Sequence, residues 1–456
     1  MRLTPQRWLL LAGAIHITLT LAIFLVGHFQ LLPAFVDQYG SAGAVSSFVS
    51  DGAAYRDLAS DLANQLQANG LSAWLAIRAP LHCRLYSLLF LTIGRLLGHN
   101  ILAAEPLNLI YYLGILACVY LLGREIFNDR SALIAAIITA VWPSFLLHST
   151  QFLRDSLSIL CLLGLLLLLT LLLTRVLTWS NGLLTGVAGS ALLAFFWVLR
   201  GNMWNVVILA VGIALVLLAW RTIRARKVFS GNTIALVLVL LAMLLVPPRL
   251  ESTSFAGHRL PVTPLAIPTT TQPAPAENVI VRALKQIVAR RSGFHSYRAR
   301  ESDIDAEVRF TSVGDIVRFI PRATAIGFCA PFPRMWFQSG TSGRAARLLS
   351  GAETLAMYFL YVAAFVAVWR NRRRLELWLL FLVATIGTMA LGLVVVNAGA
   401  LYRLRYVFWI MFIIMAADTL VHFTVLRTNA AKSRMSSSVV SNDAMNRHSD
   451  VSSFQT

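Results

Sequence analysis

The sequence predicts an all-helical integral membrane protein: a polytopic bundle of about ten transmembrane helices with interfacial helices and one long extracytoplasmic loop. Two observations lead to this prediction. The 456 residues are 57% hydrophobic and only 13% charged, and the mean hydropathy is +0.70, which excludes an ordinary soluble domain. Apolar runs of roughly 17 to 25 residues, long enough to cross a bilayer core of about 30 Å, recur along most of the chain. Such runs must be helical because lipid offers the backbone no hydrogen bonds.

The apolar runs predict ten spans in order along the chain. The first run follows Arg2 and Arg7, is long, and lacks a small-residue cleavage pattern, so it is expected to be a retained anchor rather than a signal peptide. The expected spans cover residues 8–27, 103–122, 131–147, 157–174, 183–199, 203–220, 232–248, 352–369, 375–395 and 406–426.

The apolar segment Leu85–Leu97 is too short for a span and carries Arg95, so we expect an interfacial helix there. The charge of the short loops supports this choice, because cytoplasmic loops are enriched in Lys and Arg. Counting Leu85–Leu97 as a span would place all the downstream basic loops outside. With both termini cytoplasmic, the inside loops hold Arg124, Arg130, Arg175, Arg221, Arg224, Arg226, Lys227, Arg370, Arg372, Arg373, Arg374, Arg427, Lys432 and Arg434.

This topology divides the chain into four parts. Residues 1–248 form a transmembrane module with extracytoplasmic loops 28–102 and 143–156, and residues 249–351 form an extracytoplasmic loop region. Residues 352–426 supply the C-terminal transmembrane helices, and residues 427–456 are expected to be a disordered cytoplasmic tail. Within the long loop we expect a Pro- and Thr-rich linker over Pro261–Pro275, an amphipathic basic helix over Val279–Arg291, and a helix over Val313–Ile320 capped by Ser312.

The charge and the cysteines give no sign of nucleic-acid or metal binding. The net charge of +19 is dispersed over inter-helix loops rather than gathered on one element. Cys83 and Cys329 both fall in loops expected outside, where a disulfide between them would persist. Phosphate-binding glycine loops, paired metal-ligand motifs and serine-centred elbows are absent from the sequence, so it gives no support to soluble-type nucleotide or hydrolase chemistry.

Asp51 and Asp155 are the two acids that stand at the outer ends of helical segments. Asp51 lies just ahead of a helical stretch in the first outside loop, followed by Tyr55 and then by Arg78-Ala79-Pro80. A carboxylate held there can accept the proton of an acceptor hydroxyl, although an N-cap role suits the same position. Asp155 stands at the mouth of a strongly apolar helix, where it is either functional or a cap paired with Arg154.

Three arginines lie in outside turns, against the usual charge bias. They are Arg200, between the fifth and sixth spans, and Arg403 and Arg405, before the last span. Arginine suits a phosphate because its planar fork donates two parallel, charge-assisted hydrogen bonds. Anionic phospholipid headgroups would satisfy the same side chains, so the two interpretations stay open at this stage.

The order of these features resembles the GT-C superfamily of polyprenyl-phosphate-sugar-dependent glycosyltransferases, particularly protein O-mannosyltransferases and the aminoarabinose transferase for lipid A. The matching features are Asp51 with Tyr55, then Arg78-Ala79-Pro80, the helix to Gly98, the turn Arg124–Arg130, and Asp155. The resemblance covers residues 1–220 and extends loosely to the turn that carries Arg403 and Arg405.

The resemblance implies an inverting transfer of a sugar from a polyprenyl-phosphate donor to an extracytoplasmic lipid, glycan or protein acceptor, in a bacterial inner membrane. Asp51 would be the general base, and Asp155 a second acid that positions the acceptor or the interfacial helix. Arg403, Arg405 and Arg200 would hold the donor phosphate, while Tyr55, Arg78 and Arg154 would position the acceptor. The donor is already activated, so no nucleotide cofactor is required, and the residues give no specific support for a divalent metal.

Three other functions remain open from the sequence. An O-antigen or wall-polymer polymerase or ligase would also be polytopic with outside arginines, and could use the long loop 249–351. A lipid-linked glycan flippase or transporter needs charges along a path through its spans, whereas here the polar clusters gather on one side. A non-catalytic scaffold would use Asp51 and Asp155 as helix caps.

Overall fold

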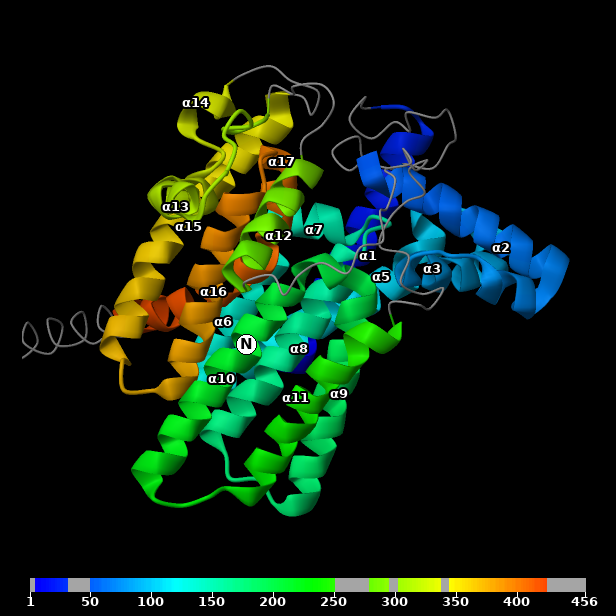
Figure 1. Cartoon of the computed structure of the whole chain (residues 1–456). Helices are drawn as coiled ribbons and strands as arrows, with labels where there is room; N and C mark the ends of the chain where they lie inside the picture. Colours follow the sequence, from blue (N-terminus) through cyan, green and yellow to red (C-terminus); the bar gives the residue numbers. More distant parts are fainter. Residues whose placement is uncertain (1–4, 32–49, 251–278, 295–301, 338–343, 425–456) are drawn as a thin grey trace, which may run out of the picture.

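The protein is a bundle of long helices with a group of shorter ones at one end (Figure 1). This computed structural model describes residues 5–31, 50–250, 279–294, 302–337 and 344–424. Over these ranges the chain is helical apart from turns, irregular segments and isolated bridges, so the predicted fold class is confirmed. The Pro261–Pro275 linker and the tail 427–456 lie outside the described residues.

Helices cover the expected apolar runs, and shorter or more polar helices lie between them. Their bounds are α1 Pro5–His28, α2 Ser50–Ala76, α3 Leu81–Thr92, α4 Gly94–Leu97, α5 Ile101–Ile126, α6 Asp129–Ala140, α7 Pro143–Ser149, α8 Asp155–Thr174, α9 Trp179–Arg200, the 3-10 turn η2 Gly201–Met203, α10 Trp204–Ala225, α11 Ser230–Leu250, α12 Val279–Gly293, α13 Val313–Cys329, α14 Pro333–Trp336, α15 Arg344–Arg370, α16 Leu375–Val394 and α17 Ala398–Leu404. A last helix covers Tyr406–Thr424.

The expected number of ten spans is not confirmed. By length and composition, the described part of the chain has eight helices able to cross a membrane, or nine if α6 and α7 form one broken span. That pair, expected as a single span over 131–147, is bent by 67°, because the chain breaks between Ala140 and Pro143. The 47-residue stretch Trp179–Ala225 counts once among the eight, although it contains α9 and α10.

The chain reverses direction between α9 and α10. Arg200 at the end of α9 contacts Asp155 at the start of α8, so these two helices run antiparallel. Arg221 near the end of α10 donates to the carbonyls of Leu172 and Arg175 at the other end of α8. α8 and α10 therefore run in the same direction, and α9 returns beside them.

Polar caps set where several helices begin. Asn100 accepts from Leu102 N at 2.9 Å at the start of α5, and Asn128 accepts from Ser131 N at 3.0 Å at the start of α6. Ser312 and Asp315 form a reciprocal capping box at α13, which confirms the predicted cap, but the helix continues beyond Ile320 to Cys329. The basic helix expected over Val279–Arg291 is α12, and the expected interfacial segment Leu85–Leu97 is divided into α3 and α4.

Glycines allow close helix approach at two places. A β-carbon at Gly182 would meet the backbone of Gly231, which joins α9 to α11. A β-carbon at Gly327 would meet the carbonyl of Thr388, and one at Gly392 would meet the carbonyl of Ala323. Small residues of this kind bring helix backbones together in membrane proteins. Consequently α13, from the long loop region, packs tightly along α16.

The long helices bury more ionisable side chains than the sequence suggested. His16 of α1 donates to Glu105 of α5 with an Nδ1–Oε1 distance of 2.7 Å, and Asp418 of the last helix accepts from Arg370 at 2.6 Å. Glu353 of α15 is buried among uncharged donors. Each acid has a polar partner, as burial in an apolar surrounding requires. All four cysteines are free thiols, so Cys83 and Cys329 do not pair.

Candidate functional site

Two carboxylates from separate parts of the chain converge on Arg403. The Asp51 Oδ2 atom lies 2.6 Å from Arg403 Nη2, and the Asp155 Oδ2 atom lies 3.5 Å from Arg403 Nε. Arg200 Nη2 donates to the other oxygen of Asp155. We call Asp51, Asp155, Arg200 and Arg403 the acid–arginine cluster. Four of the residues expected in a site from the sequence are thus brought together.

Helix ends position the members of the cluster. Asp51 lies in the first turn of α2 and Asp155 is the first residue of α8, where the helix dipole favours negative charge. Arg200 lies in the last turn of α9, where the dipole favours positive charge. Arg403 lies in the last turn of the short helix α17. Charges of both signs can therefore be held side by side with local backbone support.

The long loop region fixes the segment that carries Arg403. Ile304 N donates to the Val396 carbonyl at 2.7 Å, and Ala398 N donates to the Ser302 carbonyl at 2.9 Å. Asn397 accepts from Ala400 N at 3.0 Å and so caps α17. These bonds form a short backbone pairing that ties α17 to residues 302–304. The loop region, unmatched by any expected motif, thus supports the cluster.

Most of the cluster is shielded from water. The side chains of Asp155 and Arg200 are 7% and 5% exposed, that of Arg403 is 20% exposed, and that of Asp51 is 45% exposed. Burial alone would lower the pKa of Arg403, but the charges of Asp155 and Asp51 outweigh it and raise that pKa. Arg403 therefore remains a cation, and the accessible carboxylate of the cluster is that of Asp51.

A small pocket opens beside the cluster. Asp155, Arg200 and Arg403 line its polar side, and Ile159, Phe196, Met203, Leu404 and Val407 line much of its apolar side. The Nε atoms of Arg200 and Arg403 are buried there with no hydrogen-bond partner in the described part of the chain. A pocket with spare cationic donors and an apolar wall is chemically suited to an anion attached to a hydrocarbon chain.

Neither Asp51 nor Asp155 serves as the helix N-cap that the sequence also suggested. α2 begins at Ser50, so Asp51 lies inside its first turn and its carboxylate contacts Arg403 instead. At α8 the cap position is Arg154, with no side-chain cap hydrogen bond. The ion-pair partners of Asp155 are Arg200 and Arg403, whereas the sequence had suggested Arg154. Long-range pairing has replaced both local roles.

Arg405 lies apart from the cluster. Its side chain is fully buried, donates to the Gly327 carbonyl at 2.8 Å and sits 4.5 Å from the ring centroid of Trp409. Residues two apart on a helix are separated by about 200° around its axis, so Arg403 and Arg405 face opposite sides. A cation near the carbonyls that end α13 also complements that helix dipole. Arg405 thus stabilises the contact between the last helix and α13, and it does not line the pocket beside the acid–arginine cluster.

The three expected acceptor-positioning residues differ in placement. Tyr55 is buried, with its ring edge-to-face against His82 at a centroid distance of 4.5 Å, and burial raises the pKa of its hydroxyl. Arg154 is half-buried and interacts electrostatically with Tyr55. Arg78 is exposed, and within the described ranges it forms no ion pair with the cluster. Tyr55 and Arg154 therefore adjoin the cluster, and Arg78 does not.

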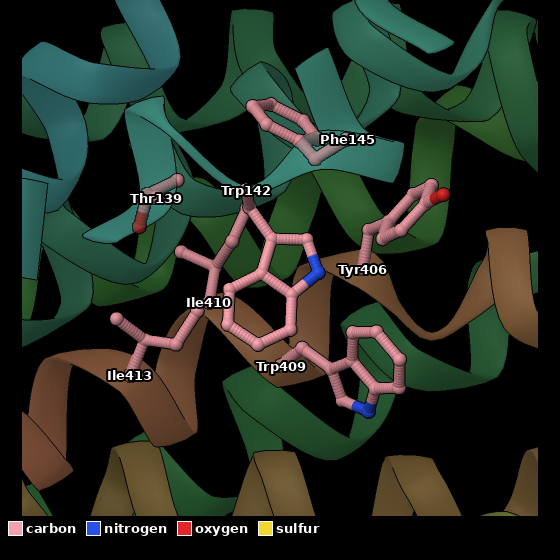
Figure 2. A pocket seen from close by; sticks show the side chains of 7 residues that line it. All are labelled: Thr139, Trp142, Phe145, Tyr406, Trp409, Ile410 and Ile413. Carbon is pink, nitrogen blue, oxygen red and sulfur yellow. The ribbon is translucent and has the colours of Figure 1, made fainter. Parts of the chain in front are cut away.

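Glu353 and the residues around it form a second polar centre that sequence reasoning missed. Its carboxylate accepts from Trp142 Nε1 at 2.9 Å, from Ser144 N at 2.7 Å and from the Tyr402 hydroxyl. Figure 2 shows the aromatic pocket lined by Trp142, in which the rings of Trp142 and Trp409 lie next to each other, edge to face, with a centroid distance of 5.9 Å. An ionisable residue inside an apolar run is the signal that could have revealed this centre.

No group of three or more His, Cys, Asp or Glu side chains suited to a metal ion occurs within the described ranges.

One family model matches the middle part of the chain. Residues 83–245, just over a third of the chain, match the family model of dolichyl-phosphate-mannose-protein mannosyltransferases. That family is of the GT-C type, so the resemblance expected from the sequence is confirmed. No curated protein matches the chain.

One similar solved structure is the archaeal oligosaccharyltransferase AglB from Archaeoglobus fulgidus, in complex with an inhibitory peptide and a dolichol-phosphate. The sequences are 12% identical, the TM-score is 0.46, and the alignment covers 94% of this chain and 52% of that one. The chain thus spans about half the length of that protein.

Proposed function

We propose that this multi-pass membrane protein of the GT-C type transfers a sugar from a polyprenyl-phosphate donor to an extracytoplasmic acceptor. The observation that carries the proposal is the convergence of Asp51 and Asp155 on Arg403, beside a pocket with an apolar wall. The matched mannosyltransferase family supports a lipid-linked sugar as the donor class.

Arg403 and Arg200 are the proposed ligands of the donor phosphate. Both border the pocket. The buried Nε–H of Arg200 has no hydrogen-bond partner in the described part of the chain, and that of Arg403 has only the 3.5 Å ion-pair contact with Asp155. In a transfer from a phosphate-linked sugar, negative charge accumulates on the departing polyprenyl phosphate. Guanidinium groups fixed beside that phosphate stabilise the transition state more than the ground state, which is what lowers the barrier.

The apolar side of the same pocket gives the lipid chain a path. Phe196, Leu404 and Val407 lie next to the arginines, so a phosphate held by Arg403 would direct its first isoprene units along them. Apolar side chains at this place match the hydrocarbon of a lipid phosphate and offer no hydrogen bond to a free phosphate. This arrangement favours a lipid phosphate over a free one.

Asp51 is the proposed general base. Its carboxylate is the most exposed group of the acid–arginine cluster, and among the described residues its ion-pair partner is Arg403. A donor phosphate competes for the same guanidinium, so donor binding would release Asp51 to accept the proton of the acceptor. Asp155 stays between Arg200 and Arg403 and keeps both cations in place.

The sidedness of the site is part of the proposal. The loops rich in Lys and Arg follow the C-terminal ends of α5, α10 and α15. These ends are opposite to the helix ends that carry Asp51 and Asp155. By the positive-inside rule those basic loops are cytoplasmic. The acid–arginine cluster is then extracytoplasmic, where polyprenyl-linked sugars are used.

Profiling of cells tests the proposal. Cells with the gene deleted are compared by glycan and lipid mass spectrometry, after complementation with wild type, Asp51→Asn or Asp61→Asn. Asp61 is exposed on the same helix α2, so it controls for a lost charge. We expect wild type and Asp61→Asn, but not Asp51→Asn, to restore a sugar modification.

Two other results would count against the proposal. If all three proteins restore the modification, Asp51 is not the base. If deletion instead shortens a polymer without removing a sugar, a polymerase or ligase is favoured.

A further inference from the structure

The short helix α7 is held from both sides by buried polar side chains of the long helices. Near its start, Ser144 donates to Glu353 of α15; near its end, the Ser149 hydroxyl lies 3.0 Å from His16 Nε2 of α1. His16 is itself held by Glu105. Burying such groups is costly unless their hydrogen bonds are made, so together they define one position for a helix of seven residues.

His148 is the ionisable residue that this helix carries. The residue is half-buried, and its ring interacts electrostatically with Arg403 and Asp155. The ring also packs edge-to-face against the ring of Tyr406, with a centroid distance of 5.4 Å. The fixed position of α7 therefore places an imidazole beside the acid–arginine cluster. The mechanism proposed above does not use it.

Hydrogen bonding selects the tautomer of His148. Its Nδ1 atom lies 2.6 Å from the carbonyl oxygen of Ser144, which can only accept, so Nδ1 carries the proton. The Tyr406 hydroxyl lies 3.0 Å from the same Nδ1 atom. In the neutral ring the other nitrogen, Nε2, then presents a lone pair. Nε2 lies on the side of the ring away from the Ser144 carbonyl.

We propose that His148 binds the acceptor substrate, with Nε2 accepting a hydrogen bond from a hydroxyl or N–H group of that acceptor. This inference rests on the proposed function and narrows it, because the acceptor must then present a donor group beside the reacting oxygen. An acceptor that offers only phosphate oxygens has no proton for this lone pair. Asp51 remains the base, and His148 orients the molecule whose proton Asp51 removes.

A pH dependence follows from the same geometry. Protonation of Nε2 would remove the lone pair, so use of the acceptor should fall as the ring becomes charged. The charged and titratable groups facing His148 are Asp155 from α8, Arg403 from α17 and Tyr406 from the last helix. Burial and the charge of Arg403 disfavour the imidazolium, whereas the Ser144 carbonyl and the charge of Asp155 favour it. A change in the acid limb when only His148 is substituted therefore reports on this ring.

Two substitutions separate recognition from folding. In His148→Asn the amide can still donate to Ser144, but no atom reaches the place of Nε2. In His148→Gln an amide oxygen can occupy the place of Nε2 and accept at any pH. Purified variants are assayed with membranes of the deletion strain as acceptor and lipid-linked sugars extracted from that strain as donor, across a range of pH.

We expect His148→Asn to raise the apparent KM for acceptor about five- to tenfold, the worth of one hydrogen bond, with the donor KM unchanged. His148→Gln should retain acceptor use near neutral pH and shift the acid limb, the fall in acceptor use at low pH, to lower pH, because the general base Asp51 is still present. An unchanged acceptor KM in His148→Asn overturns the inference. So does an acid limb that stays at its wild-type pH in His148→Gln, or equal loss in both variants.

The wild-type protein separates this inference from the proposed function. If wild type transfers no sugar under these conditions, the proposed function itself fails. If wild type transfers sugar and both variants match it, only the role of His148 fails. Thermal unfolding of each purified variant shows whether a loss reflects misfolding, and Tyr406→Phe controls for disturbance of the hydroxyl beside Nδ1.

Discussion

Arg403 Nη2 lies 2.6 Å from Asp51 Oδ2, which joins the first turn of α2 to the last turn of α17. The same guanidinium reaches Asp155 through Nε. One side chain thus links two acids that the sequence places in different loops.

Arg403→Lys should impair donor use. Lysine keeps the positive charge, but its ammonium group is a compact point charge. It lacks the planar guanidinium whose several N–H groups can bind Asp51, Asp155 and a phosphate together. We expect the apparent KM for the lipid-linked donor to rise at least tenfold, about 1.4 kcal/mol. Initial rates at varied donor concentration measure it. Arg318→Lys, at an exposed position of α13, is the matched control and should leave the donor KM unchanged.

Arg405→Ala should reduce stability and leave donor binding intact. The substitution removes the hydrogen bond to the Gly327 carbonyl and the contact with Trp409, and it leaves a buried acceptor unpaired. The expected loss is on the order of 2 kcal/mol, seen as a lower melting temperature of the purified protein. A raised donor KM with unchanged melting would instead return Arg405 to the phosphate site.

Asp315 should make the start of α13 sensitive to acid. Hydrogen bonds from Thr311 and Ser312 lower the pKa of its carboxyl from 3.8 to about 2. Because the folded pKa is depressed, the stabilisation is present above pH 3.8 and is lost as pH falls through about 2. Hydrogen exchange of the α13 amides should therefore differ between wild type and Asp315→Asn at pH 5 and converge near pH 2. A constant difference across this range would contradict the assignment.

Local patterns predicted much of the fold and the membership of the cluster. Apolar run length located the long helices, and the Ser312 cap was readable because its reciprocal partner Asp315 is three residues away. Asp51, Asp155, Arg200 and Arg403 could be nominated because charged side chains at the mouths of apolar helices are costly without a role. Each of these signals is contained within a few residues of sequence.

Pairing across the chain could not be read in the same way. The partner of Asp155 is Arg200 rather than its neighbour Arg154, and Arg405 faces α13 although it stands two residues from Arg403. Such choices depend on how helices rotate about their axes when they pack. The burial of Glu353 likewise arises from tertiary contacts. The bend between α6 and α7, in contrast, lies at Pro143, a local helix-start signal inside the run expected as one span.

The most direct test of the central claim measures donor binding and turnover on the same purified proteins. Asp51→Asn and the control Asp61→Asn are compared with wild type, with lipid-linked sugar as donor and membranes of the deletion strain as acceptor. If Asp51 is the general base, Asp51→Asn binds donor within a fewfold of wild type but loses on the order of a hundredfold or more in kcat. A kcat close to that of wild type would contradict the account.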